Sequence, residues 1–296
     1  MKVLVTGAAG FIGAHVVRQL LARGHQAYAV VRPGGPAARL EDVLDAVTIV
    51  EADLGDHAQI EALLRAVRPD AIVHLAWYTE PGRYQQALTE NVASLAVTAA
   101  LLLAASESGC PRFVLAGTCL ENADTSTRTM YDAAKRAAHA LSLGFASTGM
   151  TVACGHVFYL YGPWEDERRV IPSVIRALLS NEPVATTDGR QPRDYLHVSD
   201  VASGFGFLVE SSVTGRVDIC SGSLVPLKDV FEAIGEEVAR PQLLRIGELG
   251  SSSDGGFPSS GDPGPLIRLG WRPRHSLRTG IRDTVAWWNA RQEVRS

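Results

Sequence analysis

The chain has 296 residues, of which 46% are hydrophobic and 20% are charged. This composition is typical of a folded globular protein and excludes a disordered one. The net charge is −4 and the 28 basic residues are scattered along the chain, which argues against a nucleic-acid partner. The first residues lack a secretory signal, and the apolar stretch 92–105 is too short to span a bilayer. We therefore expect a cytoplasmic protein with no membrane partner.

The cysteines give no sign of a disulfide or metal framework. They stand apart in the chain, without a CxxC pair and without histidines at metal-ligand spacing. They are Cys110, Cys119, Cys154 and Cys220. The sequence predicts reduced, core-packed cysteines and no metal site.

The first half alternates short β-rich apolar runs with longer Ala/Leu-rich segments of helical periodicity. This pattern predicts right-handed βαβ units that form a parallel sheet. Strands are expected at Lys2–Thr6, Gln26–Val31, Val47–Glu51, Ala71–Leu75, Phe113–Ala116 and Val152–Val157. Helices are expected at Phe11–Arg23, His57–Val67, Tyr84–Ser108, Tyr131–Ser147 and Val170–Ser180.

After about Gly162 the alternation weakens, and short pieces follow one another at irregular spacing. This change predicts a second, smaller lobe. We expect residues 1–161 to form a dinucleotide-binding domain, with 194–220 returning to it. Residues 162–193 and 221–296 would form the smaller substrate-binding lobe.

Three glycines occupy the turn between the first predicted strand and the first predicted helix. Gly7 permits a tight turn, Gly10 lets the backbone approach a pyrophosphate, and Gly13 allows the helix to pack closely on the sheet. Phe11 and Ile12 begin the helix, whose N-terminal N–H groups favour an anion. The sequence therefore predicts a dinucleotide site at this turn.

The second strand ends at Val31 and is followed by Arg32, with no carboxylate at the position that accepts the ribose hydroxyls of NAD. Arg32 can pair with a 2′-phosphate, so NADP(H) is favoured and NAD(H) stays open. A solvated surface arginine is the alternative interpretation. Asp53 can accept a hydrogen bond from the adenine amino group, with Leu54 covering the ring, or it can cap a helix.

The order of further motifs resembles the extended short-chain dehydrogenase/reductase family, the NAD-dependent epimerase/dehydratase type that modifies nucleotide sugars. The resemblance rests on segments spread over nearly the whole chain. They are Thr6–Gly13, Asp53–Leu54, His74–Ala76, Asn91, Thr118, Tyr131–Lys135, Tyr161–Pro163, Arg193–Val198, Asp200 and Leu269–Pro273.

The resemblance implies an α/β fold, a Rossmann-type doubly wound parallel sheet with a smaller C-terminal substrate lobe. It also implies cofactor contacts from Leu75, Ala76, Asn91 and Val157, besides Tyr131 and Lys135. The Ala/Leu-rich helices at 84–108 and 131–147 are expected to form a four-helix homodimer interface.

Tyr131 and Lys135 are spaced to lie on one helical face. Hydride transfer to a carbonyl creates an alkoxide that needs a proton, and Tyr131 can supply it as donor or remove it as base. An ammonium beside the phenol is expected to lower its pKa towards working pH. The resemblance implies that Lys135 also reaches the nicotinamide ribose. Thr118, at the end of the fifth strand, matches the family's Ser/Thr and would orient the substrate carbonyl.

Substrate contacts are expected from both halves of the chain. The segment between Thr118 and Tyr131 is shorter than is usual in the family, so either the pocket is more open or residues such as Trp77, Tyr78 and Trp164 cover the sugar. Arg193 resembles the arginine that binds the substrate diphosphate. Tyr159 stands where the family has an asparagine.

A second departure is His156, which stands where the family has an arginine. We expect it to be a packed residue of the core.

The leading hypothesis is an NADPH-dependent ketoreductase of a nucleotide-activated 4-keto-6-deoxy sugar. An NAD-dependent 4-epimerase and a non-catalytic NADP-binding sensor remain alternatives. A dehydratase is less favoured, because by resemblance that chemistry needs a carboxylate pair just after the Ser/Thr. Here Glu121 stands one position late and without a partner carboxylate.

Overall fold

The computed structural model describes residues 1–122, 129–251 and 260–293. The chain forms two compact units. The first contains residues 1–157, 201–219 and 264–271, and the second contains 158–200, 220–263 and 272–296. The expected boundaries differ from these. Residues 158–161, 194–200 and 220 lie in the second unit, and residues 264–271 return to the first, because their helix packs on the last strand of its sheet.

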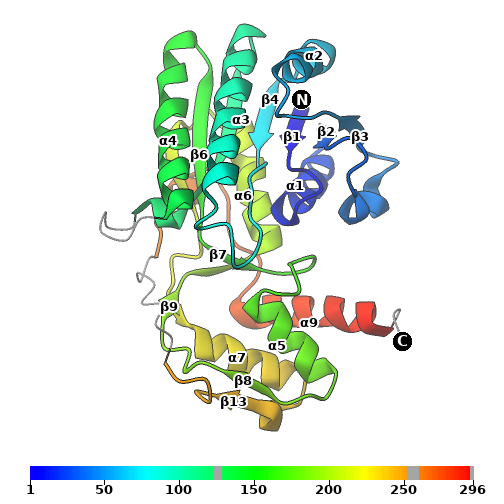
Figure 1. Ribbon diagram of the computed structural model, residues 1–296, viewed down its shortest axis with the longest axis vertical. Coiled ribbons are helices and arrows are strands. Elements are labelled where there is room, and N and C mark those ends of the chain that lie inside the picture. Colours follow the sequence, from blue (N-terminus) through cyan, green and yellow to red (C-terminus); the bar gives the residue numbers. More distant parts are fainter. Residues whose placement is uncertain (123–128, 252–259, 294–296) are drawn as a thin grey trace. The chain divides into compact units, whose positions relative to one another are not determined.

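The first unit is built on a seven-stranded parallel sheet (Figure 1). Its strands are β1 (Lys2–Thr6), β2 (Gln26–Val31), β3 (Thr48–Glu51), β4 (Ala71–His74), β5 (Arg112–Thr118), β6 (Thr151–Val157) and β11 (Gly215–Ile219). They lie in the order β11-β6-β5-β4-β1-β2-β3. The order reverses between β1 and β4, which is the switch point where doubly wound sheets bind ligands.

Within the described residues, the α-helices of this unit are α1 (Phe11–Ala22), α2 (His57–Val67), α3 (Leu88–Glu107), α4 (Met130–Gly144), α6 (Val198–Glu210) and α8 (Gly264–Arg268). The first three residues of α6 belong to the second unit. A continuous apolar core joins one face of the sheet to α2, α3 and α4, with Leu4, Ile72 and Phe113 completely buried. The predicted doubly wound α/β fold is confirmed.

The largest boundary error concerns α3, which begins at Leu88 and not at Tyr84. Residues before it form turns, and the buried Asn91 amide donates hydrogen bonds to the carbonyls of Tyr84 and Ala87 at 2.6 and 2.7 Å. These bonds hold the chain in a turn where helical periodicity alone would continue the helix. A 3-10 helix follows α4 at Phe145–Thr148, up to Gly149 with φ +87°.

Backbone crowding explains two glycines of the β1–α1 turn. Gly7 has φ +66°, and a Cβ there would lie 2.8 Å from the Ala76 nitrogen. A Cβ on Gly13 would lie 2.1 Å from the Gly7 carbonyl oxygen. Only glycine lets the turn, the start of α1 and the segment after β4 approach this closely.

The second unit is smaller and mixed. Its helices are α5 (Val170–Leu179), α7 (Leu227–Glu237) and α9 (Leu277–Glu293), which pack around a second apolar core. Three two-stranded sheets complete it: β7 (Tyr159–Tyr161) with β10 (Tyr195–His197), β9 (Pro192–Arg193) with β12 (Val225–Pro226), and β8 (Val184–Thr186) with β13 (Leu244–Ile246).

Two buried carboxylates hold the loops of this unit. Asp194 accepts hydrogen bonds from the backbone N–H groups of Ser221 and Gly222 at 2.8 and 2.9 Å. Asp200 accepts from the N–H groups of Arg274 and His275 at 2.9 and 3.0 Å. These two aspartates of the RDYLHVSD segment therefore shape the unit's backbone.

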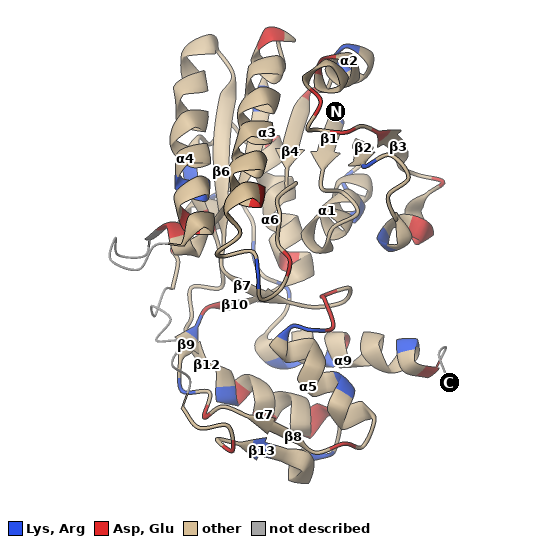
Figure 2. Cartoon of the chain, in the orientation of Figure 1, with Lys and Arg blue, Asp and Glu red and all other residues tan. Residues whose placement is uncertain are grey.

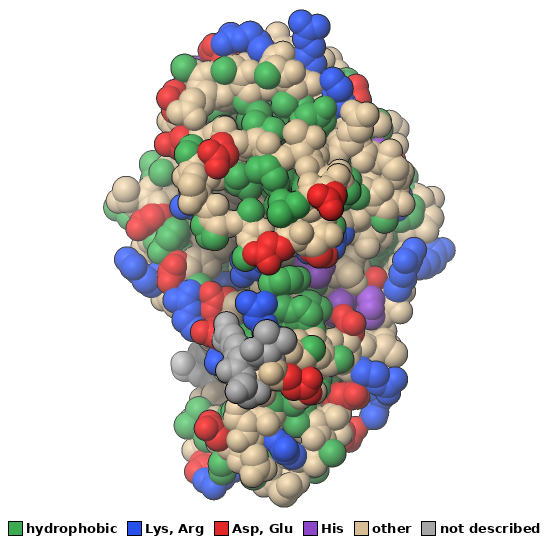
Figure 3. All heavy atoms as spheres, turned by 90° about the vertical axis from the view of Figure 1, so that its right-hand side faces the viewer, with side chains coloured by type: hydrophobic (Ala, Val, Ile, Leu, Met, Phe, Trp, Pro, Cys, Tyr) green, Lys and Arg blue, Asp and Glu red, His purple; other side chains and the backbone are tan. Residues whose placement is uncertain are grey.

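Lys and Arg are interspersed with Asp and Glu along the described chain (Figure 2), and both charge types occur on the face shown in Figure 3. All four cysteines are buried and free, as predicted. The apolar stretch expected at 92–105 is part of the longer helix α3. The expectation that it is too short to span a bilayer is wrong, because by length and composition α3 is apolar enough to cross a membrane. One third of this stretch is buried in the unit, where α3 packs against α2 and α4.

Candidate functional site

The predicted catalytic and cofactor residues of the first unit lie mainly at the carboxyl edge of its sheet. The strand register pairs Thr6 with His74 and Thr118 with Val157, so the ends of β1, β4, β5 and β6 share this edge. The glycine-rich turn follows β1 at the switch point. Ligands of open α/β sheets bind in this position.

The start of α1 fits a phosphate. Its N-cap is Gly10, which makes no side-chain cap hydrogen bond, so the first-turn N–H groups at Phe11, Ile12 and Gly13 are not capped by a side chain. Uncapped N–H groups at a helix N-terminus attract anions. The residues present therefore fit the pyrophosphate of a dinucleotide.

Arg32 is exposed directly after β2. Sequence reasoning missed Arg39, which lies in a 3-10 helix at Ala38–Val43 and donates to the Ala9 carbonyl in the glycine-rich turn at 3.3 Å. The sequence feature that could have pointed to Arg39 is its position seven residues after Arg32, in the same loop region after the second strand. Both guanidinium groups belong to the part of the unit that follows β2.

The remaining cofactor candidates fall into three groups. Asp53 is exposed and accepts from the Gly55 N–H at 2.9 Å, beside the half-buried Leu54. Leu75, Ala76 and Val157 follow or end strands at the carboxyl edge. Asn91 is fully buried and has structural bonds, since its Oδ1 accepts from the Trp77 indole N–H at 2.9 Å besides the two carbonyl bonds of its amide.

A buried hydroxyl–imidazole chain joins β1, β4 and α3. His74 Nδ1 lies 2.7 Å from the Thr6 hydroxyl, and its Nε2 lies 2.9 Å from the Thr98 hydroxyl. Thr98 donates its own proton to the Ser94 carbonyl, so it accepts from His74 Nε2–H, and Nδ1 accepts from Thr6. Burial, with a smaller effect of Lys135, lowers the pKa of His74 to about 3. His74 is therefore neutral and structural.

Thr118 and Tyr131 are brought together. The Thr118 hydroxyl lies near the Tyr131 phenol and acts to lower its pKa, although burial outweighs this effect. The start of α4 is held by a reciprocal capping box in which Thr129 and Asp132 bond each other's backbone N–H at 3.2 Å. Tyr131 lies inside this first turn, so its position is set by the backbone. Residues 123–128, which contain most of the shortened segment before it, lie outside the described residues.

The Lys135 side chain is buried between β5 and the Trp77 ring. Its Nζ donates to the Ala116 carbonyl at 3.0 Å and lies 3.8 Å from the centroid of the Trp77 ring. Trp77 is itself held by Asn91. Burial lowers the pKa of Lys135 to about 8, although the Glu121 carboxylate opposes the change.

The expected effect of Lys135 on Tyr131 is wrong for the structure as it stands. Burial raises the pKa of the Tyr131 phenol above its usual value, and the neighbouring Tyr84 adds to this. The Lys135 ammonium lies 5.9 Å from the Tyr131 ring centroid and is directed to Ala116 and Trp77. Tyr131 is therefore held as a neutral phenol that can donate a proton.

Glu121 turns away from the Thr118 hydroxyl. Its Oε1 accepts from the Thr118 backbone N–H at 2.9 Å, and its Oε2 faces His139 and His156 at 3.1 and 3.2 Å. Burial favours the protonated form, but these histidine hydrogen bonds outweigh it and hold the pKa of Glu121 well below its usual value. The carboxylate is engaged in a separate buried cluster with Cys154, which the sequence spacing did not reveal.

The second unit brings together its two predicted substrate residues. The Arg193 guanidinium stacks 4.2 Å from the centroid of the Tyr159 ring. Stacking orients the planar guanidinium, which suits bidentate binding of a diphosphate. Tyr78 belongs to the first unit, where its N–H donates to Ser94 at 3.3 Å.

The same unit contains a carboxyl group that sequence reasoning missed. Burial raises the pKa of Glu165 to about 8, with Asp166 adding to the shift and Arg169 opposing it. Within the described residues its buried Oε2 has no hydrogen-bond partner. In the sequence, the feature that could have pointed to Glu165 is its position shortly after the Tyr161–Pro163 motif.

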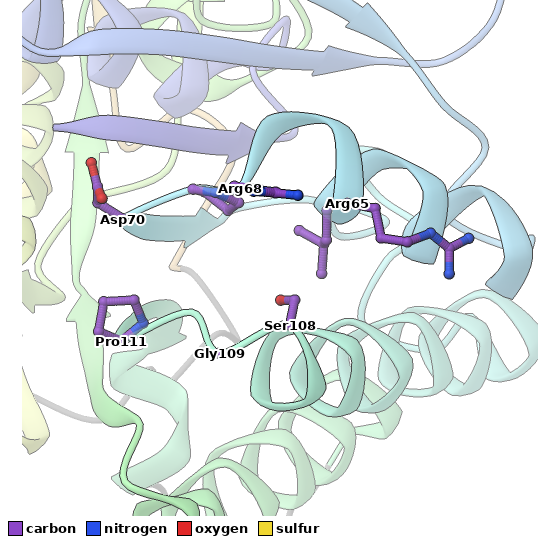
Figure 4. A pocket seen from close by; sticks show the side chains of 8 residues that line it. Arg65, Arg68, Asp70, Ser108, Gly109 and Pro111 are labelled. Carbon is purple, nitrogen blue, oxygen red and sulfur yellow. The ribbon is translucent and has the colours of Figure 1, made fainter.

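A hollow of about 380 Å³ in the first unit lies at the opposite edge of the sheet (Figure 4). Arg65 and Arg68 line it with Asp70, Ser108 and Pro111, at the ends of α2 and α3 and before β4 and β5. It is separate from the strand ends that bear Thr118 and His74 and is not the candidate active site.

A doubly wound sheet, an uncapped glycine turn at its switch point and a Thr–Tyr–Lys group define a class of nicotinamide-dinucleotide enzymes of α/β fold. The chain belongs to the NAD dependent epimerase/dehydratase family, whose model matches residues 3–220. Relatives that align with nearly the whole chain are named as enzymes that modify nucleotide sugars.

One relative is a dTDP-glucose 4,6-dehydratase of Actinoplanes sp., which is 30% identical, with 98% of each chain covered. A dTDP-4-dehydro-6-deoxy-D-allose reductase of Streptomyces bikiniensis is 27% identical, with 97% of this chain and 95% of the relative covered. Among solved structures, the dTDP-glucose 4,6-dehydratase DesIV of Streptomyces venezuelae with NAD and TYD bound has a TM-score of 0.85 and 25% identity, covering 99% of this chain and 98% of that chain.

The buried His74 predicts a specific dependence of stability on pH. Its folded-state pKa of about 3 lies below the ordinary value of 6.5, so the unfolded state binds the proton more readily. The contribution of His74 to stability should fall as pH decreases from 6.5, by about 1.4 kcal/mol per pH unit. Urea unfolding between pH 7 and 5 should therefore show that the free energy of unfolding of the wild type, relative to that of His74→Asn, decreases by this amount per unit as pH falls.

The control is His57→Gln, which changes a histidine with a 52% exposed side chain at the start of α2. It should keep the wild-type slope. An unchanged slope in His74→Asn would contradict the assignment of a buried neutral His74.

Proposed function

We propose that the protein is an NADPH-dependent ketoreductase acting on a nucleotide-activated 4-keto-6-deoxy sugar. The observation that carries the proposal is the proximity of Thr118, at the end of β5, to Tyr131, in the first turn of α4, with burial holding Tyr131 as a neutral phenol. A neutral phenol next to a carbonyl-orienting hydroxyl is the state that reduction requires. The similarity to a 4-dehydro-6-deoxy-sugar reductase supports the same substrate class.

In this proposal Thr118 donates a hydrogen bond to the substrate carbonyl and holds it beside Tyr131. A nicotinamide dinucleotide, when held at the glycine turn, would supply the hydride for reduction of this carbonyl. Tyr131 donates its proton to the oxygen, and the Lys135 ammonium stabilises the phenolate that remains. The glycine turn at Gly10–Gly13 binds the pyrophosphate, and Arg193, oriented by Tyr159, binds the diphosphate of the sugar nucleotide.

The position of Glu121 favours a reductase over a dehydratase, although one relative has the latter activity. Elimination of water needs an acid–base carboxylate beside the Ser/Thr hydroxyl. Glu121 instead uses both oxygens in bonds to the Thr118 backbone, His139 and His156. A 4-epimerase with retained NAD is the second candidate, and structures similar to this chain have NAD bound. A non-catalytic sensor is the third.

We also propose a homodimer formed by α3 and α4, which pack side by side (Figure 1). Along α3 the exposed Leu88, Val92 and Leu103 fall within about 60° of the helix circumference. Charged residues of α3 stand only near its ends, at Glu90 and Glu107. Such an apolar stripe beside α4 suits a self-complementary helical interface. A reducing, cytoplasmic setting, in which the four thiols persist, completes the proposal.

The proposed proton donor is tested with Tyr131→Phe. Removal of the hydroxyl should lower kcat on a 4-keto-6-deoxy sugar nucleotide by about 10²–10⁴-fold, since general acid catalysis contributes this much. NADPH affinity, measured by fluorescence titration, should stay within about threefold, because a single hydrogen bond to the ribose contributes little. The matched control Tyr28→Phe, on the half-buried face of β2, should keep both properties.

No turnover by the wild type on any such substrate, with intact NADPH binding, would favour the sensor.

The NADP preference is tested with Arg32→Ala. A charge-assisted bond to the 2′-phosphate contributes about 1.5–3 kcal/mol, so the variant should lose about 10–100-fold of NADPH affinity and little of NADH affinity. Arg65→Ala, at the opposite edge of the sheet, should leave both affinities unchanged. Co-purified NAD together with weak NADPH binding would instead favour the epimerase.

The homodimer is tested by light scattering at micromolar concentration. The wild type should have twice the 31.7 kDa mass of one chain. Leu103→Glu combined with Leu141→Glu, two residues more than 40% exposed on α3 and α4, should give a monomer because it buries charge in the interface. Leu249→Glu, at an exposed leucine of the second unit, should remain dimeric. A monomeric wild type would contradict the proposal.

A further inference from the structure

Behind the end of β5, four potential metal ligands converge from three elements of the first unit. Glu121 lies in a 3-10 helix at Cys119–Asn122, His139 on α4, and Cys154 and His156 on β6. Their donor atoms all lie within 4.8 Å of one another. The set of one carboxylate, two imidazoles and one thiol matches the ligands that zinc takes in proteins.

The distances between three of these atoms match a tetrahedral site. Glu121 Oε2 lies 3.1 Å from His139 Nδ1 and 3.2 Å from His156 Nε2, and the two nitrogens are 3.3 Å apart. Ligands about 2.0 Å from a central tetrahedral metal are separated by about 3.3 Å. The three atoms thus form one face of a tetrahedron of the right size, and the Cys154 sulfur supplies the fourth donor.

Gly117 provides the space for this convergence. A Cβ at Gly117 would lie 2.8 Å from Cys154 Sγ, 2.5 Å from His156 Cδ2 and 2.9 Å from Glu121 Oε1. Three of the four ligands therefore press against the backbone just before Thr118, and any larger residue would separate them. The absence of a side chain at this position is a local requirement of the cluster.

Charge balance also favours a dication. The side chains of Glu121 and His156 are 3% and 1% exposed, and that of His139 is 17% exposed. A buried carboxylate and a thiolate together carry two negative charges, which a dication neutralises in full. With both histidines neutral, the assembled site has no net charge, and burial then carries a small electrostatic cost.

We propose that Glu121, His139, Cys154 and His156 bind one zinc-like divalent cation in a closed structural site. The cation would join the 3-10 helix, α4 and β6. Glu121 also accepts from the Thr118 N–H through its other oxygen, so the site fixes the end of β5 from behind. Such a hydrogen bond is the outer-sphere contact that orients metal ligands. With four protein ligands and no open position, the ion is structural and takes no part in the reaction proposed above.

The test measures the metal directly and does not depend on turnover. Protein purified without a metal-affinity step is analysed by mass spectrometry for bound zinc, and the apoprotein is titrated with Co²⁺. We expect about one equivalent of metal per chain, visible absorption of tetrahedral cobalt and a near-ultraviolet thiolate-to-cobalt band. A chelator should lower the melting temperature of the wild type.

Cys154→Ala should lose the thiolate band and at least tenfold of Co²⁺ affinity, and its melting temperature should no longer respond to chelator. His139→Ala, which changes a partly exposed side chain on α4, gives a second variant with the same expected loss of affinity. Cys110→Ala, at a buried free cysteine just before β5, is the matched control and should bind metal as the wild type does.

Wild type without stoichiometric zinc and without a cobalt band would overturn the proposal. The cluster would then be a carboxylate that accepts two imidazole N–H groups. Equal loss of the band in Cys154→Ala and Cys110→Ala would overturn it as well.

Discussion

The end of β5 is the constraint on which the candidate active site depends. Thr118 is the last residue of a strand that is buried along its whole length. Its hydroxyl lies near Tyr131, and its backbone N–H donates a hydrogen bond to Glu121. The residue before it must be glycine, because the Glu121 cluster occupies the space of a side chain. One short backbone segment thus sets both the donor geometry in front and the polar cluster behind.

Burial decides how the titratable groups around this strand behave. His74 is kept neutral, Lys135 is brought to a pKa of about 8 and Tyr131 is kept protonated, all because desolvation disfavours a charged form. Glu121 is the exception, since two histidines hydrogen-bond its carboxylate. A neutral tyrosine next to a caged lysine suits proton donation, which is why the proposed reaction is a reduction.

Family membership limits the chemistry without choosing the reaction. Dehydratases, epimerases and reductases all match over nearly the full length of this chain at about 25–30% identity. The family model matches residues 3–220, which include the glycine turn, Thr118, Tyr131 and Lys135. By the resemblance described above, His156 and Tyr159 stand where the family has an arginine and an asparagine. His156 joins the carboxylate cluster, and Tyr159 stacks on Arg193.

The sequence by itself determined the alternating β and α segments, the glycine turn and the Tyr131–Lys135 helical face, because these depend on residues close together in the chain. It did not show where α3 begins, since the bonds of the Asn91 side chain end the preceding turn. It gave no sign that residues 264–271 return to the first unit. Only the tertiary structure showed that Lys135 is directed to Ala116 and Trp77, and that Glu121, His139, Cys154 and His156 converge. Such contacts depend on strand register and helix packing between distant segments, which local spacing does not encode.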